Sequence, residues 1–130
     1  MILLVEDSLS AREATQAILE MSGYQVLTAA NGREAIRLAR DHQAELDLVL
    51  SDLVMPEMGG VELYHAVKRI NPAIQVMIMT GYPLELEGRA LLEEGIVNWI
   101  QKPFSIRQLT DQIGNLLSQR VASPLYPSSA

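Results

Sequence analysis

Five short apolar runs occur along the chain, and most are followed directly by polar residues. They cover residues 2–5, 25–28, 48–50, 76–79 and 97–100. The first, third and fourth runs are apolar throughout, whereas a strand with one solvated face would alternate apolar and polar residues. Uninterrupted apolar runs of this length are typical of strands buried on both faces of a parallel sheet. The pattern therefore predicts five strands in a parallel arrangement.

Segments with helical periodicity separate these strands. Apolar residues recur every three or four positions, which is the spacing of one face of a helix. They are Ala14, Ala17, Ile18 and Met21 in the first segment, Leu63, Ala66, Val67 and Ile70 in the third, and Leu109, Ile113, Leu116 and Leu117 in the fifth. The second and fourth segments, around 35–39 and 84–94, have weaker periodicity. Helices are therefore predicted between the strands and after the last one.

Residues suited to helix ends flank these segments. Two pairs have the spacing of a capping box, one glycine follows the first helix where a left-handed C-cap belongs, and one proline can open the fourth helix. They are Asn31 with Glu34, Ser105 with Gln108, Gly23 and Pro83. Strands and helices that alternate in this way predict an α/β fold, a doubly wound parallel sheet with helices on both faces.

A single domain accounts for almost all of the 130 residues. Residues 1–120 are predicted to form it, because the alternation of strands and helices continues without a break over this range. Residues 121–130 are rich in Ser and Pro, and we expect them to be a flexible C-terminal tail or a truncated linker.

Composition and charge exclude several classes of function. The chain has 10 Lys and Arg against 16 Asp and Glu, and its net charge of −6 provides no electrostatic drive toward DNA or RNA. It has no Cys, which excludes disulfides, thiolate catalysis and Cys-bound zinc. No stretch approaches the ~20 apolar residues of a membrane helix, and no signal peptide pattern opens the chain. We therefore expect a cytoplasmic protein that contacts neither nucleic acid nor the membrane.

Charged and hydroxyl side chains follow four of the five predicted strands. They are Glu6 and Asp7 after the first, Asp52 after the third, Thr80 after the fourth and Lys102 after the fifth. Ligands bind outside the carboxyl ends of the strands in open parallel sheets, so these side chains are expected to converge. Three close carboxylates repel one another unless a cation lies between them, and oxygen ligands without His or Cys favour Mg²⁺. Together with a hydroxyl and an ammonium group, they suit the transfer of a phosphoryl group.

Taken alone, each of these residues has an ordinary structural explanation. Asp52 could cap a helix, Glu6 and Asp7 could form a solvated turn, and a threonine before glycine is a common turn residue. Lys102 is harder to explain in this way, because the chain has only two Lys residues and the other lies within a predicted helix. The functional interpretation therefore depends on the whole set lying at strand ends.

Several motifs of this chain resemble those of the receiver domain of two-component response regulators. They are Val5-Glu6-Asp7, Leu50-Ser51-Asp52-Leu53-Val54-Met55-Pro56 with Gly59-Gly60, Met79-Thr80-Gly81 and Lys102-Pro103-Phe104. The resemblance extends from Ile2 to about Gln119. It implies a flavodoxin-like (βα)5 fold with strand order 2-1-3-4-5.

The resemblance implies a phosphoacceptor and a metal site. Asp52 would receive a phosphoryl group from a phosphohistidine and form an acyl phosphate. Asp7, Asp52 and the backbone carbonyl of Val54 would hold Mg²⁺. Glu6, which replaces the Asp common at this position in the family, would contribute through a water molecule.

The resemblance also implies a conformational switch. Lys102 would pair with the phosphoryl oxygens, and Thr80 would donate a hydrogen bond to one of them. Trp99 stands three residues before Lys102, at the position of the switch residue of the family. Movement of Thr80 and Trp99 would repack the surface formed by the fourth helix, the fifth strand and the fifth helix. The Lys102-Pro103 peptide bond would be cis.

Partners follow from the same resemblance. The phosphodonor would be a histidine kinase or a histidine phosphotransfer domain, the output would pass to a downstream protein effector, and a homodimer could form on phosphorylation. The domain would catalyse its own phosphorylation and dephosphorylation without being an enzyme in the ordinary sense. The motifs are most like those of receivers at the C-terminus of hybrid sensor histidine kinases, with a free-standing regulator as the other possibility.

Two alternative functions belong to other classes. A pseudo-receiver would bind partners without phosphorylation, but such modules typically lack one of the site residues present here. A phosphohydrolase of the haloacid dehalogenase type also uses Asp, Thr or Ser, and Lys at strand ends, but it carries a second acid where this chain has Val54. We expect Val54 and Tyr82, which are bulky and flank the phosphoryl site in the family, to limit water attack on the acyl phosphate.

Overall fold

The computed structural model describes residues 1–81 and 84–121, and these include a five-stranded sheet. All neighbouring strands are parallel, in the order β2-β1-β3-β4-β5. The strands are β1 (Ile2–Val5), β2 (Val26–Ala29), β3 (Leu48–Asp52), β4 (Gln75–Thr80) and β5 (Trp99–Gln101). The predicted flavodoxin-like sheet and its strand order are confirmed.

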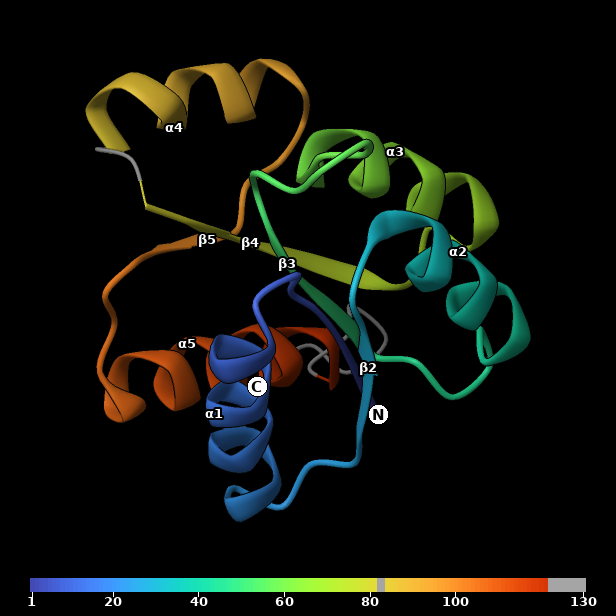
Figure 1. Cartoon of the computed structure of the whole chain (residues 1–130), viewed down its shortest axis with the longest axis vertical. Helices are drawn as coiled ribbons and strands as arrows, with labels where there is room; N and C mark the ends of the chain where they lie inside the picture. The colour runs from blue at the N-terminus through green and yellow to red at the C-terminus, as the bar shows by residue number, and fades with distance from the viewer. Residues whose placement is uncertain (82–83, 122–130) are drawn as a thin grey trace, which may run out of the picture.

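A helix follows each strand, and the helices form a layer on each face of the sheet. They are α1 (Leu9–Met21), α2 (Gly32–Asp41), α3 (Gly60–Ile70), α4 (Leu84–Glu93) and α5 (Ile106–Val121). Figure 1 shows α1 and α5 on one side of the sheet, with α2, α3 and α4 on the other. Within the described residues, none of the helices has the length and apolar character needed to cross a membrane.

The strands are apolar throughout because they pack against both helical layers. In β1, Leu3 and Val5 belong to the core under α2, α3 and α4. Ile2 and Leu4, which point to the opposite face, belong to the core under α1 and α5. All four side chains are 0% exposed. A polar residue at any of these positions would be buried without water, which explains the absence of alternation in the sequence.

Hydrogen bonds at the helix ends confirm Asn31 as an N-cap and Ser105 with Gln108 as a capping box. The Oδ1 atom of Asn31 accepts a hydrogen bond from the backbone N–H of Glu34 at 2.8 Å. Ser105 and Gln108 form a complete capping box, in which each side chain accepts a hydrogen bond from the backbone N–H of the other, at 3.0 and 2.8 Å. Gly23 has a φ of +95°, as its C-cap role requires. Pro83 lies outside the described residues.

The helix α1 is present, and Ile18 of its predicted apolar face packs against the core, but the other three residues of that face are wrong. Met21 is 85% exposed, and Ala14 and Ala17 are also exposed. The buried residues of the helix are Thr15 and Leu19. Alanine is a good helix former whose small side chain loses little when it stays in water, so its periodicity does not indicate which face is buried. The large side chain of Leu19 determines the orientation instead.

Candidate functional site

Three carboxylates meet at the carboxyl edge of the sheet. Glu6 and Asp7 directly follow β1, and Asp52 is the last residue of β3. The two strands are neighbours with Val5 opposite Ser51, so the residues that follow them emerge side by side. One carboxylate oxygen from each of the three residues lies within 4.8 Å of the others. The convergence predicted from the strand ends is confirmed.

The burial of these carboxylates suits a divalent cation. Glu6 and Asp52 are only 3% and 8% exposed, whereas Asp7 is exposed to solvent. Mg²⁺ prefers carboxylate and carbonyl oxygens and usually keeps several of its water molecules, so it requires an oxygen-lined site that is open on one side. The donor set of Glu6, Asp7 and Asp52 fits that requirement, because buried like charges are stabilised by a cation between them.

The local environment makes Glu6 a weaker acid than an ordinary glutamate. Its burial, followed by the hydrogen bond and the negative charge of Asp52, raises the pKa of Glu6 from 4.5 to about 7. Lys102 acts in the opposite direction but does not compensate for these effects. A cation at the three carboxylates would favour the charged form of Glu6, so proton binding and metal binding at this position oppose each other.

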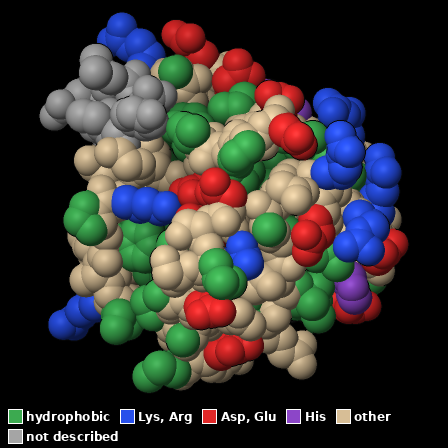
Figure 2. All heavy atoms as spheres, in the orientation of Figure 1, with side chains coloured by type: hydrophobic (Ala, Val, Ile, Leu, Met, Phe, Trp, Pro, Cys, Tyr) green, Lys and Arg blue, Asp and Glu red, His purple; other side chains and the backbone are tan. Residues whose placement is uncertain are grey.

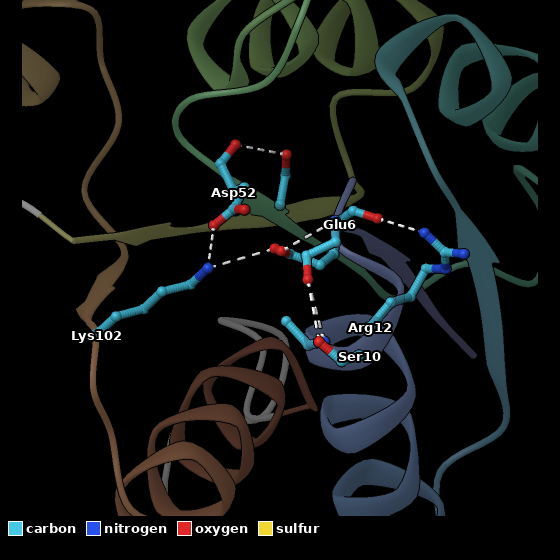
Figure 3. A network of polar contacts seen from close by, with 8 residues as sticks. Glu6, Ser10, Arg12, Asp52 and Lys102 are labelled. Carbon is cyan, nitrogen blue, oxygen red and sulfur yellow. Dashed lines mark hydrogen bonds and ion pairs between the residues drawn. The ribbon is translucent and has the colours of Figure 1, made fainter.

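Lys102 supplies the positive charge of the site. Figure 3 shows its side chain reaching across to Asp52 and Glu6. The Nζ atom lies 2.6 Å from Oδ1 of Asp52 and 3.3 Å from Oε2 of Glu6. Burial alone would lower the pKa of Lys102, but the hydrogen bonds and charges of Asp52 and Glu6 outweigh burial and raise that pKa above its ordinary value of 10.5. The ammonium group is therefore charged at neutral pH.

The end of β4 holds Lys102 in place and adds Thr80 to the same edge. The backbone N–H of Lys102 donates a hydrogen bond to the carbonyl oxygen of Thr80 at 2.7 Å. Thr80 is the last residue of β4 and is 1% exposed. The Lys102-Pro103 peptide bond is cis, as the resemblance implied. All five residues predicted from the strand ends therefore lie at the carboxyl edge of the sheet.

Two other predicted residues occupy different positions. Trp99 pairs with Ile78, two residues before the end of β4, and its side chain is partly buried against the core. Val54 follows β3 by two residues, and its side chain is 61% exposed. Tyr82 lies outside the described residues.

Arg12 and Gly60 support the site, and sequence reasoning did not identify these roles. The Nη1 atom of Arg12, on the first turn of α1, donates a hydrogen bond to the backbone carbonyl of Glu6 at 2.8 Å. A Cβ atom at Gly60 would lie 2.6 Å from the carbonyl oxygen of Asp52, so only glycine allows α3 to begin so close to β3. The paired glycines were visible in the sequence as part of a motif, but their close approach to Asp52 depends on the fold.

Comparisons with known proteins agree with this geometry. The family model described as "Response regulator receiver domain" matches residues 2–114. The sensor kinase CckA of Brucella abortus is 34% identical over 119 residues, which are 92% of this chain and 13% of that protein. A cyclic di-GMP phosphodiesterase of Thermotoga maritima is 32% identical over 120 residues, which are 92% of this chain and 32% of that protein. The chain thus spans a third or less of these two relatives.

A solved structure extends the comparison to the fold. The crystal structure of a response regulator receiver domain protein from Clostridium thermocellum superposes with a TM-score of 0.85 and 27% sequence identity. The match covers 92% of this chain and 95% of that chain. Sequence and fold thus lead to the same family.

Proposed function

This chain belongs to the receiver domain family of two-component response regulators, and from that premise we propose that Asp52 is its phosphoacceptor. One observation carries the assignment. Asp52 is buried at the end of β3, with Glu6 and Asp7 beside it, and with the Nζ atom of Lys102 2.6 Å from its carboxylate. A receiver is a signalling domain and not a classical enzyme. The result of the transfer is the phosphorylated form of the domain itself.

The proposed transfer uses the side chains of the edge in distinct roles. An oxygen of the Asp52 carboxylate attacks the phosphorus of a phosphohistidine, an O–P bond forms, the N–P bond breaks, and the imidazole leaves with the electron pair. Lys102 then exchanges its ion pair with Asp52 for one with the new phosphoryl oxygens. Thr80, buried at the end of β4, would donate a hydrogen bond to one of these oxygens.

Receiver domains generally bind Mg²⁺, and we propose that this chain does so through the three carboxylates. Asp7 and Asp52 would be direct ligands together with the backbone carbonyl of Val54, and Glu6 would act through water. Bound Mg²⁺ neutralises negative charge on the transferring phosphoryl group. The support for this site is the 4.8 Å cluster of carboxylate oxygens and its partial opening to solvent.

We propose that the phosphodonor, a histidine kinase or a histidine phosphotransfer domain, docks between α1 and the segment that follows β5. A hollow of about 280 Å³ lies there, and its lining includes Ile18 and Phe104 as well as Glu6 and Lys102. Beside it, Leu9 at the start of α1 and Ile106 at the start of α5 are exposed large apolar residues. A protein seated on this surface would present its phosphohistidine directly to Asp52.

We propose that phosphorylation changes the surface through which the domain passes on its signal. Phosphorylation would draw Thr80 toward the phosphoryl group and Trp99 inward, which would alter the surface of α4, β5 and α5 for a protein effector or a second copy.

We propose that the domain covers residues 1–120, that residues 121–130 are a tail or linker, and that the protein is cytoplasmic. The relative CckA is named a sensor kinase, which supports attachment of this receiver to a histidine kinase.

Phosphorylation by a small donor tests the proposed function. The chain would be incubated with acetyl phosphate and Mg²⁺, and its intact mass would be measured over time, with Asp52→Asn as the matched control. We expect the mass of one phosphoryl group to appear, to be absent when Mg²⁺ is chelated before the donor is added, and to be absent in the variant. If Mg²⁺ binds but no phosphoryl group is gained, the pseudo-receiver function replaces this proposal.

A further inference from the structure

Four arginines form an exposed stripe on the outer surface of α2 and α3. Arg33, Arg37 and Arg40 are spaced by four and three residues, so they lie along one side of α2. Arg69, in the last turn of α3, lines the same hollow as Arg40. Figure 2 shows blue side chains gathered down the right-hand side of the view, over α2 and α3. We call these four residues the arginine face.

This concentration of positive charge is unusual for the chain. The arginine face holds four of the ten Lys and Arg residues of a protein whose net charge is −6. All four side chains are exposed. With the side chains that the structure describes, those of residues 1–81 and 89–118, none of the four guanidinium groups makes an ion pair or a hydrogen bond. Their charge is therefore available to an anionic partner.

An apolar floor lies between the arginines. Two adjoining hollows, of about 760 and 570 Å³, share Ile36 and Arg40 in their linings. Met58 completes the floor of the first hollow, and Ala66 and Ile70 that of the second. Met58 packs closely over the start of α2. A Cβ atom added at Gly32 would lie only 2.6 Å from the sulfur of Met58. Apolar residues surrounded by charged ones are the usual composition of a protein-binding surface.

We propose that the arginine face binds an acidic amphipathic helix of a partner protein. A groove between two helices accommodates a third helix, whose apolar side would cover Ile36 and Met58. Because residues 33–40 extend over about 10 Å of α2, two turns of a partner helix with carboxylates three or four residues apart would match the arginines. This surface shares no residue with the carboxyl edge, so the interaction does not require phosphorylation.

A partner protein fits this surface better than a nucleic acid does. Single-stranded nucleic acids bind through aromatic side chains on which their bases stack, and neither hollow has an aromatic residue in its lining. The acids Glu34 and Asp41 also line the first hollow, and they would repel a continuous phosphate backbone. A helix can place its carboxylates opposite the arginines and avoid these two acids.

Binding of a designed peptide to the full chain tests the proposal. The probe is a fluorescent peptide of about 18 residues, long enough for measurable helicity, with Leu along one face and Glu along the other. A second peptide has the same composition in a scrambled order, so it keeps the charge but loses the apolar face. We expect only the amphipathic peptide to bind in fluorescence anisotropy and to shift amide NMR signals of α2 and α3.

Charge reversal identifies the residues involved. Arg37→Glu with Arg40→Glu should weaken peptide binding by about tenfold or more, which is at least ~1.4 kcal/mol. The matched control is Arg89→Glu with Arg107→Glu, which makes the same change in net charge on α4 and α5 and should leave binding within about twofold. Circular dichroism of both variants checks folding, and the milder Arg37→Gln with Arg40→Gln should give an intermediate loss.

Several outcomes would overturn the proposal. One is no peptide binding at low ionic strength, and another is equal weakening by both double variants, since that would indicate attraction to net charge alone. Equal binding of the scrambled peptide would remove the role of the apolar floor. Tighter binding of a single-stranded oligonucleotide, or of vesicles rich in anionic lipid, at the same α2 and α3 signals would replace the proposed partner with one of those classes.

Discussion

Charged side chains occur in opposite settings at the carboxyl edge of the sheet and on the arginine face. At the edge, Glu6 and Asp52 are buried, and Lys102 lies within 3.3 Å of both. On the arginine face, four guanidinium groups are exposed and, among the described residues, unpaired. Buried charges lose the stabilisation of water and need a partner or a metal, whereas exposed charges remain solvated.

This difference indicates different uses of charge. A buried, paired set changes its bonding when a phosphoryl group or a cation enters, so it suits chemistry. An exposed, unpaired set changes little until a partner of opposite charge arrives, so it suits recognition. Substitutions at the edge should therefore alter phosphorylation and stability, and substitutions on the arginine face should alter association alone.

The two lysines of the chain provide the largest expected contrast. Lys102→Ala should lower the rate of phosphorylation by acetyl phosphate about a hundredfold, because one charge that stabilises the transferring group is lost. Lys68 donates hydrogen bonds to the carbonyl oxygens of Pro72 and Ile74, at 3.3 and 2.6 Å, after the end of α3. Lys68→Ala should cost about 1 kcal/mol of unfolding free energy and leave the rate unchanged. Similar rates for both variants would contradict the role of Lys102.

Glu6 should make the stability of the metal-free protein depend on pH. Its pKa is raised from 4.5 to about 7 on folding, so the folded state holds the proton more tightly than the unfolded state does. This contribution is fully present below pH 4.5 and is lost as the pH rises through about 7. Glu6→Gln should therefore be more stable than the wild type at pH 8, by about 1–3 kcal/mol in chemical denaturation without metal.

Proton binding at Glu6 should also make the affinity for Mg²⁺ depend on pH. Because the cation favours the charged form of Glu6, Mg²⁺ affinity of the wild type should fall as the pH decreases below about 7. Calorimetric titrations at several pH values would measure this slope, and Glu6→Gln should reduce it. An identical pH dependence in the two proteins would exclude Glu6 from the metal site.

Val54 tests whether an exposed residue close to the carboxyl edge affects phosphorylation as the buried residues of that edge do. Its side chain is 61% exposed, as open as a surface residue, but it follows Asp52 by two positions. We expect Val54→Asn to shorten the lifetime of the acyl phosphate severalfold, because a polar side chain there would position the attacking water. The measurement is the loss of phosphorylated mass after the donor is removed. An unchanged lifetime would show that Val54 does not limit water attack.

The smallest effect is expected on the arginine face. Arg37→Glu with Arg40→Glu should change the phosphorylation rate by less than about twofold and the unfolding free energy by less than about 0.5 kcal/mol, because both side chains are exposed and unpaired. The same mass measurement and a denaturation curve would check this. A large change in either quantity would break the distinction between the two regions.

The carboxyl edge could be predicted from the sequence because its signals are local. Each of its polar residues directly follows an apolar strand, and parallel strands end at a common edge. Strand order came from the resemblance to receivers, since alternation of strands and helices does not specify it. The supporting role of Arg12 could not be predicted, because its hydrogen bond to the carbonyl of Glu6 depends on how α1 leaves the edge.

Two surface features could not be predicted in this way, because they depend on how the helices pack. The alanines of α1 suggested a buried face, but only Leu19 among the large side chains of that helix is fully buried. The arginine face was hidden by the net charge of −6, which averages a basic surface with a more acidic remainder. Its spacing at 33, 37 and 40 was readable, but the position of Arg69 beside it follows from the packing of α3 against α2.

The position of the phosphoryl group tests the central claim most directly. After reaction with acetyl phosphate and Mg²⁺, borohydride reduces an acyl phosphate to an alcohol, and peptide mass mapping then identifies the altered residue. The structure predicts conversion of Asp52 to homoserine, only in the presence of Mg²⁺. Conversion at Glu6 or Asp7, or no conversion while Mg²⁺ is bound, would contradict the assignment of this edge as a phosphoacceptor site centred on Asp52.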